Sequence, residues 1–266
     1  MKKITLILIG ALLLSLAACS QTPASTPTTT AAPTVGIYVP DTVAIAGPDG
    51  TTLLAATYRY EEGWETKSQF SVTCEASSDI PPELAAALAT MLPATTYTPG
   101  CVTTELPTVN KTQTFYDAAG QVTSQVITYL NNNGTDKLET FYTYDQQGRR
   151  LTEESKQYAT GAEKPHTTVM TYVYGEIEEG TLGEAKRSNL TYQLEYDKQN
   201  RLIGYNTLMD GQLFMRYSYT YDAAGNRTGS IQYVQGAMVT DTKTTYRLVQ
   251  VSEAFAEAFP MFNREK

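Results

Sequence analysis

Alternation of hydrophobic and polar residues dominates the second half of the chain. In residues 215–221, Met and Tyr occupy one parity and Arg, Ser and Thr occupy the other. Residues 138–144 alternate in the same way, with Leu, Thr and Tyr on one side. A period of two is typical of a β-strand that turns one aromatic face toward a core. The pattern therefore predicts strands that are joined in sequence order.

A short phrase closes several of these predicted strands. It consists of Tyr-Asp, two variable residues, and a Gly or Asn four positions after the Tyr. The copies begin at Tyr116, Tyr144, Tyr196 and Tyr221, which are 28, 52 and 25 residues apart. Weaker copies occur at residues 58–63, at residues 171–175 and at Tyr246. A period of this length is typical of stacked supersecondary units.

Each copy predicts a hairpin turn. An Asp carboxylate is expected to accept hydrogen bonds from the backbone N–H groups just ahead of it, and the Gly or Asn to supply a positive φ. The turn residues are Asp117 and Gly120, Asp145 and Gly148, Asp197 and Asn200, and Asp222 and Gly225. Weak calcium binding is the alternative for the aspartates, but their spacing is not that of a calcium loop. The predicted fold is mainly β, an antiparallel meander of hairpins in an open, twisted or curled sheet over residues 35–266.

The phrase Tyr-Asp-x-x-Gly-Arg resembles the YD repeat of the Rhs family. The resemblance covers about residues 112–249, roughly half of the chain. Large Rhs proteins wind many such repeats into a hollow β-shell around a toxin or peptide. The resemblance therefore implies a repeat sheet here, although about five to seven units are too few to enclose a domain.

The first 34 residues follow a different pattern. Lys2 and Lys3 precede a short apolar run, and the run ends in Leu16-Ala17-Ala18-Cys19, which resembles the lipobox of bacterial lipoproteins. The resemblance implies a signal peptide over residues 1–18 and acylation of Cys19, for example by palmitate, which would anchor the chain outside the cytoplasm. The alternative is an ordinary secretory signal, and the inner and outer membranes both stay open. Residues 19–34 are rich in Ser, Thr and Pro, which predicts a flexible tether.

The two remaining cysteines predict a disulfide. Cys74 and Cys101 would pair in an oxidising compartment and close an insertion over residues 74–101. Pro81 and Pro82 precede an Ala- and Leu-rich stretch in this insertion, which predicts a short helix. A redox-active pair is the weaker alternative, because the sequence has no Cys-x-x-Cys.

The last residues of the chain leave the strand pattern. Phe255, Phe259 and Phe262 recur at helical spacing, with Glu253 and Glu257 on another face. This arrangement predicts a short amphipathic helix over residues 251–262 that caps the last edge of the sheet. A helix that docks a partner is the alternative.

Composition narrows the chemistry. The net charge is −8 and the sequence has no basic cluster, which argues against nucleic acid as a partner. A single histidine, His166, and three cysteines leave little material for a metal centre, and the sequence offers no cofactor motif. His166 is expected in an exposed hairpin tip. The sequence therefore predicts no catalytic residue, no metal and no cofactor, and the chain is expected not to be an enzyme.

Tyrosine is the one abundant aromatic residue. The chain has 19 tyrosines against 7 phenylalanines and 1 tryptophan. A tyrosine ladder suits a half-buried core, but Tyr217 and Tyr219 are also candidates for stacking on sugar rings or peptides. We expect a lipid-anchored, non-catalytic envelope protein that binds or scaffolds a carbohydrate or protein ligand. The alternatives are a glycosidase acting on envelope or other polysaccharide, and an accessory or immunity-like partner of a larger Rhs system.

Overall fold

The computed structural model describes residues 33–76, 92–106, 109–130 and 135–265. In these residues the chain forms one sheet of seventeen strands. The strands are β1 (Thr34–Ala46), β2 (Thr52–Tyr60), β3 (Phe70–Ala76), β4 (Ala94–Thr98), β5 (Cys101–Leu106), β6 (Asn110–Tyr116), β7 (Val122–Tyr129), β8 (Thr135–Tyr144), β9 (Arg150–Ala159), β10 (His166–Thr171), β11 (Val173–Ile177), β12 (Gly180–Arg187), β13 (Leu190–Asp197), β14 (Leu202–Met209), β15 (Gln212–Tyr221), β16 (Arg227–Val234) and β17 (Ala237–Ser252). A 3-10 helix, η1 (Trp64–Thr66), and an α-helix, α2 (Glu253–Ala258), complete the described elements. The predicted mainly antiparallel β fold is confirmed.

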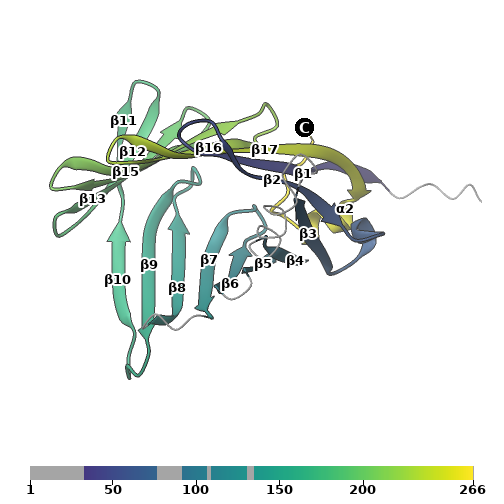
Figure 1. Ribbon diagram of the computed structural model, residues 1–266, viewed down its shortest axis with the longest axis horizontal. Coiled ribbons are helices and arrows are strands. Elements are labelled where there is room, and N and C mark those ends of the chain that lie inside the picture. Colours follow the sequence, from purple (N-terminus) through teal and green to yellow (C-terminus); the bar gives the residue numbers. More distant parts are fainter. Residues whose placement is uncertain (1–32, 77–91, 107–108, 131–134, 266) are drawn as a thin grey trace, which may run out of the picture. The chain divides into compact units, whose positions relative to one another are not determined.

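The sheet consists of two meanders joined by the first strand. Strands β2 to β10 pair antiparallel in sequence order, and so do β11 to β17. Strand β1 pairs with β2 on one side and with β17 on the other. The two free edges are therefore β10 and β11, which follow each other directly in the chain (Figure 1).

The sequence left an open, twisted sheet and a curled sheet as alternatives. The structure shows a curled sheet that nearly closes on itself. The pairing of β1 with β17 ties the first strand to the last one, so the two meanders must face each other. Near the free edges the two meanders are connected through a side chain, because the hydroxyl of Tyr174 on β11 donates to the carbonyl of Arg150 on β9 at 2.6 Å. A curled sheet gives the tyrosine side of the strands an interior to occupy.

One end of this interior is filled by a cluster that we call the aromatic plug. Its buried members are Ile37, Val39, Trp64, Phe70, Val72, Tyr97, Val251, Phe255, Ala256, Phe259 and Phe262. The rings of Phe70 and Tyr97 stack with centroids 4.8 Å apart and planes 9° from parallel. Most of these residues come from segments outside the Tyr-Asp repeats.

The C-terminal helix is shorter than predicted and has another role. α2 begins after Ser252, whose hydroxyl accepts a hydrogen bond from the N–H of Phe255 at 3.2 Å, an N-cap arrangement. Strand β17 pairs on both sides, with β1 and β16, so the helix has no sheet edge to cap. It carries Phe255 into the plug, and the following turn carries Phe259 and Phe262 there.

A second core lies in the repeat region and is rich in tyrosine. Its buried members are Met170, Tyr172, Ala185, Leu194 and Tyr196. Tyr174, Tyr192, Leu202 and Tyr205 pack against it while partly exposed. We call this cluster the repeat core.

The predicted disulfide is not formed, and both Cys74 and Cys101 are free. The strand register explains this result. Strand β4 pairs with β3 so that Cys74 lies beyond its Ala94 end, whereas Cys101 lies beside Thr98 at the other end. Five residues of strand alone correspond to roughly 16 Å, far more than the Cα separation that a disulfide tolerates.

Several predictions concern residues outside the described ranges. The signal peptide over 1–18, the lipidation of Cys19, most of the tether and the helix after Pro81 all lie there. Residues 33–266 belong to one compact unit, and β1 begins at Thr34. No helix in the described ranges is long and apolar enough to cross a membrane.

Candidate functional site

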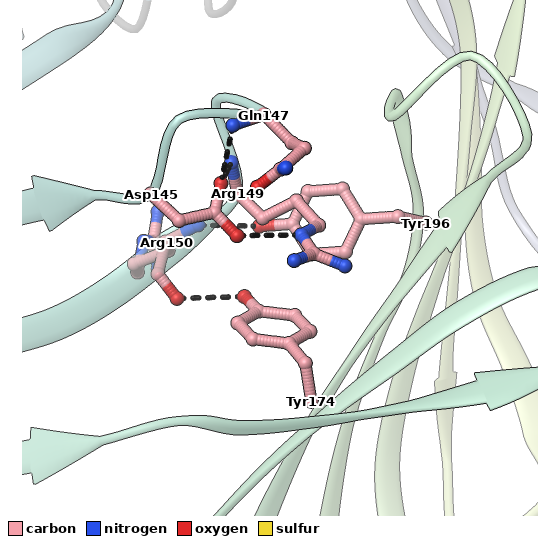
Figure 2. Close-up of polar contacts among 6 residues, drawn as sticks. All are labelled: Asp145, Gln147, Arg149, Arg150, Tyr174 and Tyr196. Atoms are coloured by element: carbon pink, nitrogen blue, oxygen red, sulfur yellow. Dashed lines mark hydrogen bonds and ion pairs between the residues drawn. The ribbon is translucent and has the colours of Figure 1, made fainter.

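The Tyr-Asp turns fix the position of the side chains that line the interior of the curled sheet. Figure 2 shows the turn after β8, where one carboxylate oxygen of Asp145 accepts from the N–H groups of Gln147 at 2.9 Å and Arg149 at 2.8 Å. The other oxygen accepts from Nε of Arg149 at 2.6 Å. Burial alone would raise the pKa of Asp145, but the hydrogen bonds from Arg149 outweigh it and lower that pKa. The carboxylate is therefore held as an anion at the centre of the turn.

The other three turns repeat this geometry. Oδ1 of Asp117, Asp197 and Asp222 accepts the N–H four residues ahead at 2.9, 2.9 and 2.8 Å. The residue four positions after each Tyr has a positive φ, which is 79° at Gly120, 80° at Gly148, 60° at Asn200 and 89° at Gly225. In the described ranges no group of three or more His, Cys, Asp or Glu is placed to hold a metal ion. The aspartates act as turn caps.

Four of the repeat tyrosines make the same contact. The hydroxyl of each of these four donates to the backbone carbonyl of the sixth residue after the Tyr of the preceding unit. The pairs are Tyr144 with Val122 at 2.6 Å, Tyr174 with Arg150 at 2.6 Å, Tyr221 with Leu202 at 2.7 Å and Tyr246 with Arg227 at 3.1 Å. Tyr174 and Tyr246, which belong to the weak copies of the phrase, therefore make the same contact as the strong copies.

Two tyrosines join the two meanders near the free edges. Tyr174 on β11 donates to the carbonyl of Arg150, while the hydroxyl of Tyr196 on β13 accepts from the N–H of Arg150 at 3.2 Å (Figure 2). The guanidinium of Arg149 lies 4.5 Å from the centre of the Tyr174 ring. One turn of the first meander is thus fastened to two strands of the second.

Arg150 forms an ion pair in the interior of the curled sheet. Its Nη1 donates to Oε2 of Glu153 at 2.9 Å, and 21% of the arginine and 16% of the glutamate side chain is exposed. The guanidinium lies 4.3 Å from the centre of the Tyr142 ring. Burial raises the pKa of Glu153, although Arg150 opposes that shift. Sequence reasoning missed this pair, whose signal was an Arg that starts a strand and a Glu three residues later.

Tyr217 and Tyr219, the predicted ligand-binding tyrosines, lie on β15 with their rings toward the interior. The two rings are parallel within 5°, with centroids 6.4 Å apart. Tyr205 on β14 is paired with Tyr217 across the strands, and their ring centroids are also 6.4 Å apart. Burial, with a contribution from Glu153, raises the pKa of Tyr205 to about 12. The Tyr205 hydroxyl therefore stays neutral at physiological pH.

A cavity of about 390 Å³ opens between the two meanders beside the plug. We call it the Arg227 cavity. It is lined by Tyr38, Pro40, Tyr97, Val102, Tyr116, Tyr221, Gly225, Asn226, Arg227, Tyr246, Met261, Phe262 and Asn263. Burial raises the pKa of both Tyr97 and Tyr116. The lining thus combines five tyrosines with one cation and contains no carboxylate.

A second cavity, of about 360 Å³, lies between β8–β10 and β12–β14. We call it the Glu153 cavity. Its lining includes Glu153, Tyr192 and Tyr205, with His166 and Arg187 3.3 Å apart on opposite meanders. His166 begins β10 and is exposed, in place of the hairpin tip that the sequence predicts. Glu153 is the one carboxylate that lines this cavity in the described ranges, and Arg150 already binds it.

Comparison with known proteins identifies the repeat. Residues 196–238 match the family model described as RHS Repeat, which confirms that this part of the chain is an Rhs-type repeat. No curated protein matches the chain.

Solved structures are only distantly similar. A porin-like protein from Bacteroides uniformis shares 10% identity and a TM-score of 0.39, with 81% of this chain and 97% of that chain covered. A putative outer membrane lipoprotein-sorting protein domain from Vibrio parahaemolyticus shares 8% identity and a TM-score of 0.30, with 82% and 86% covered. These similarities are too weak to indicate a function.

Proposed function

We propose that this chain is a non-catalytic saccharide-binding protein, held at a bacterial envelope by a lipid on Cys19, and that the Arg227 cavity is its binding site. The observation that carries the proposal is the lining of that cavity by five tyrosines, which come from β1 and from both meanders. Its volume of about 390 Å³ lies within the range of small-ligand pockets, about 300–1,000 Å³.

Tyrosine suits sugar rings for two reasons. Its ring presents an apolar face to the C–H groups of a pyranose, and its hydroxyl exchanges hydrogen bonds with sugar hydroxyls. Tyr221 and Tyr246 are oriented by their bonds to backbone carbonyls, so their rings are held in place before a ligand arrives. Such preorganisation reduces the entropy lost on binding.

The placement of the carboxylates supports a role without catalysis. A glycosidase needs two carboxyl groups that face each other across the scissile bond. The Arg227 cavity has none in its described lining, and the Glu153 cavity has one, which Arg150 engages. The arrangement favours holding a saccharide over hydrolysing it.

The binding test uses the full-length protein in detergent and a panel of glycans. We expect saturable binding by at least one glycan, weakened about tenfold or more by Tyr116→Ala, which corresponds to about 1.4 kcal/mol. Tyr158→Ala is the matched control, because Tyr158 bonds Glu139 and does not line the cavity. A silent panel would overturn the proposal, and capture of a protein in place of a glycan would favour the scaffolding alternative.

The anchor is tested separately. Cys19→Ser should release the protein from membranes and abolish labelling by a fatty acid, because the thiol is the acylation site that the lipobox resemblance implies. A variant that still sediments with membranes would overturn the lipid anchor while leaving the binding site untouched. Ser20→Ala, next to the cysteine, is the control that should stay membrane-bound.

A further inference from the structure

We propose that the Arg227 cavity selects acidic saccharides, with the guanidinium of Arg227 binding the carboxylate of a uronic acid residue. This inference rests on the proposed saccharide binding and names its ligand class. It follows from a comparison of two arginines at equivalent positions of two repeats.

Arg150 and Arg227 are each the sixth residue after a repeat tyrosine. Arg150 is paired across the strands with Tyr144, and Arg227 with Tyr221, each just after an irregularity in the register. Both guanidinium groups lie over the tyrosine two residues before that partner. The distance to the ring centre is 4.3 Å at Tyr142 and 5.0 Å at Tyr219. The two repeats therefore direct an arginine into the interior in the same way.

The two arginines differ in their counter-ion. Glu153, three residues after Arg150 and paired across the strands with Tyr142, neutralises that arginine. The corresponding residue after Arg227 is Ser230, which is paired with Tyr219 in the same way. A hydroxyl cannot neutralise a guanidinium. Across the described ranges, Arg227 forms no ion pair with an acidic side chain, and it is exposed to the cavity.

The surroundings of Arg227 favour a ligand with one negative charge on a largely neutral body. The chain carries a net charge of −8, so an isolated cation in a cavity without carboxylates is a local exception to the field of the protein. Arg presents a planar fork of donors that matches a carboxylate. A polyanion such as nucleic acid would meet one arginine here and repulsion elsewhere.

The remaining lining fits the body of such a ligand. Tyr97 and Tyr116 reach the cavity from β4 and β6, opposite Tyr221 and Tyr246. Asn263 donates to Asn226 at 2.9 Å, which closes the cavity wall near Arg227. A uronic acid residue carries the carboxylate beside ring hydroxyls and C–H groups, so its charged and neutral parts meet the matching groups in one cavity.

The test compares an oligogalacturonate with its carboxyl-reduced, neutral counterpart by calorimetry on the full-length protein in detergent. We expect the acidic oligomer to bind at least about tenfold tighter, and to weaken several-fold when salt rises from about 50 to about 500 mM. Arg227→Gln should remove the preference. The hydrogen bond from Tyr246 survives this substitution, because it is made to the backbone carbonyl of Arg227.

Ser230→Glu is the sharper variant, because it installs the counter-ion that Arg150 already has. It should abolish the preference for the acidic oligomer, whereas Ser230→Gln, of similar size and without charge, should retain it. Circular dichroism checks that each variant is folded.

Equal binding of both oligomers, unchanged in Arg227→Gln, would overturn this inference and leave the proposed saccharide binding intact. Binding of neither oligomer would also overturn it, and the proposed function would fail as well only if the wider glycan panel were silent.

Discussion

The aromatic plug and the repeat core hold the same curled sheet together by different chemistry. The plug is built largely from Phe, Trp and aliphatic residues, and Phe70 and Phe259 are each only 1% exposed. The repeat core is built largely from Tyr, and several repeat tyrosines bond backbone carbonyls of the preceding unit. A hydroxyl that must reach a polar partner limits how densely its ring can pack. The plug therefore seals one end of the interior, while the tyrosine region keeps polar cavities beside it.

The largest expected effect is in the plug. Phe70→Ala should lower the free energy of unfolding by about 3–5 kcal/mol, because the ring contacts several others and leaves a cavity behind. Phe141→Ala is the control, since Phe141 is 39% exposed and should lose much less. Chemical denaturation measures both. Similar losses at the two sites would mean that the plug is not the main apolar core.

The second effect is in the repeat interior. Glu153→Gln should destabilise the fold by about 2–3 kcal/mol, less than a fully buried pair, because about a fifth of each partner is exposed. The loss arises because Arg150 keeps its charge among tyrosines without a counter-ion. The double variant Arg150→Leu with Glu153→Leu should regain part of the stability. A double variant less stable than Glu153→Gln would contradict this account.

Two glycines compare a turn packed tightly against the backbone of the C-terminal segment with a turn whose glycine faces open space. Gly120 and Gly225 both have positive φ, but a side chain at Gly120 would collide with the backbone carbonyl of Pro260, whereas Gly225 faces open space. Gly225→Ala should cost about 1 kcal/mol of conformational strain. Gly120→Ala should cost about 1–2 kcal/mol more, because the backbone at Pro260 must shift. Equal melting temperatures for the two variants would show that the C-terminal segment yields freely.

The last effect concerns the turn carboxylates. Asp145→Asn should cost about 1–2 kcal/mol at neutral pH, because an amide cannot replace an anion that accepts from Arg149. The pKa of Asp145 is lowered by folding, so its contribution is present above the ordinary Asp pKa and is lost as pH falls through the folded value.

Acid titration of stability measures this difference. The gap between the wild type and Asp145→Asn should narrow below about pH 4. Glu178→Gln, in the exposed turn between β11 and β12, is the control and should leave the stability at neutral pH close to that of the wild type. A gap that stays constant down to low pH would mean that the carboxylate charge is not what stabilises the turn.

The sequence by itself determined the local structure. Period-two alternation predicts the strands, and the Asp and Gly or Asn of each phrase predict turns whose geometry depends on only five or six neighbouring residues. Even the weak copies at residues 171–175 and at Tyr246 were visible, because a repeat tyrosine keeps its spacing where the rest of the phrase is lost. These features depend on short-range sterics and hydrogen bonds, which a linear pattern contains.

Only the tertiary structure decided how the strands close and which charges meet. The pairing of β1 with β17 joins residues 195 to 218 positions apart, and it converts a meander into a nearly closed sheet. The register of β3, β4 and β5 separates Cys74 from Cys101, which the cysteine count alone would have joined. Likewise, the sequence shows that Glu153 follows Arg150 by three residues and that Ser230 follows Arg227 by three residues. Only the fold shows that Glu153 and Arg227 each line an interior cavity. In the folded protein Glu153 neutralises Arg150, whereas Arg227 lines a cavity without an acidic partner in the described ranges.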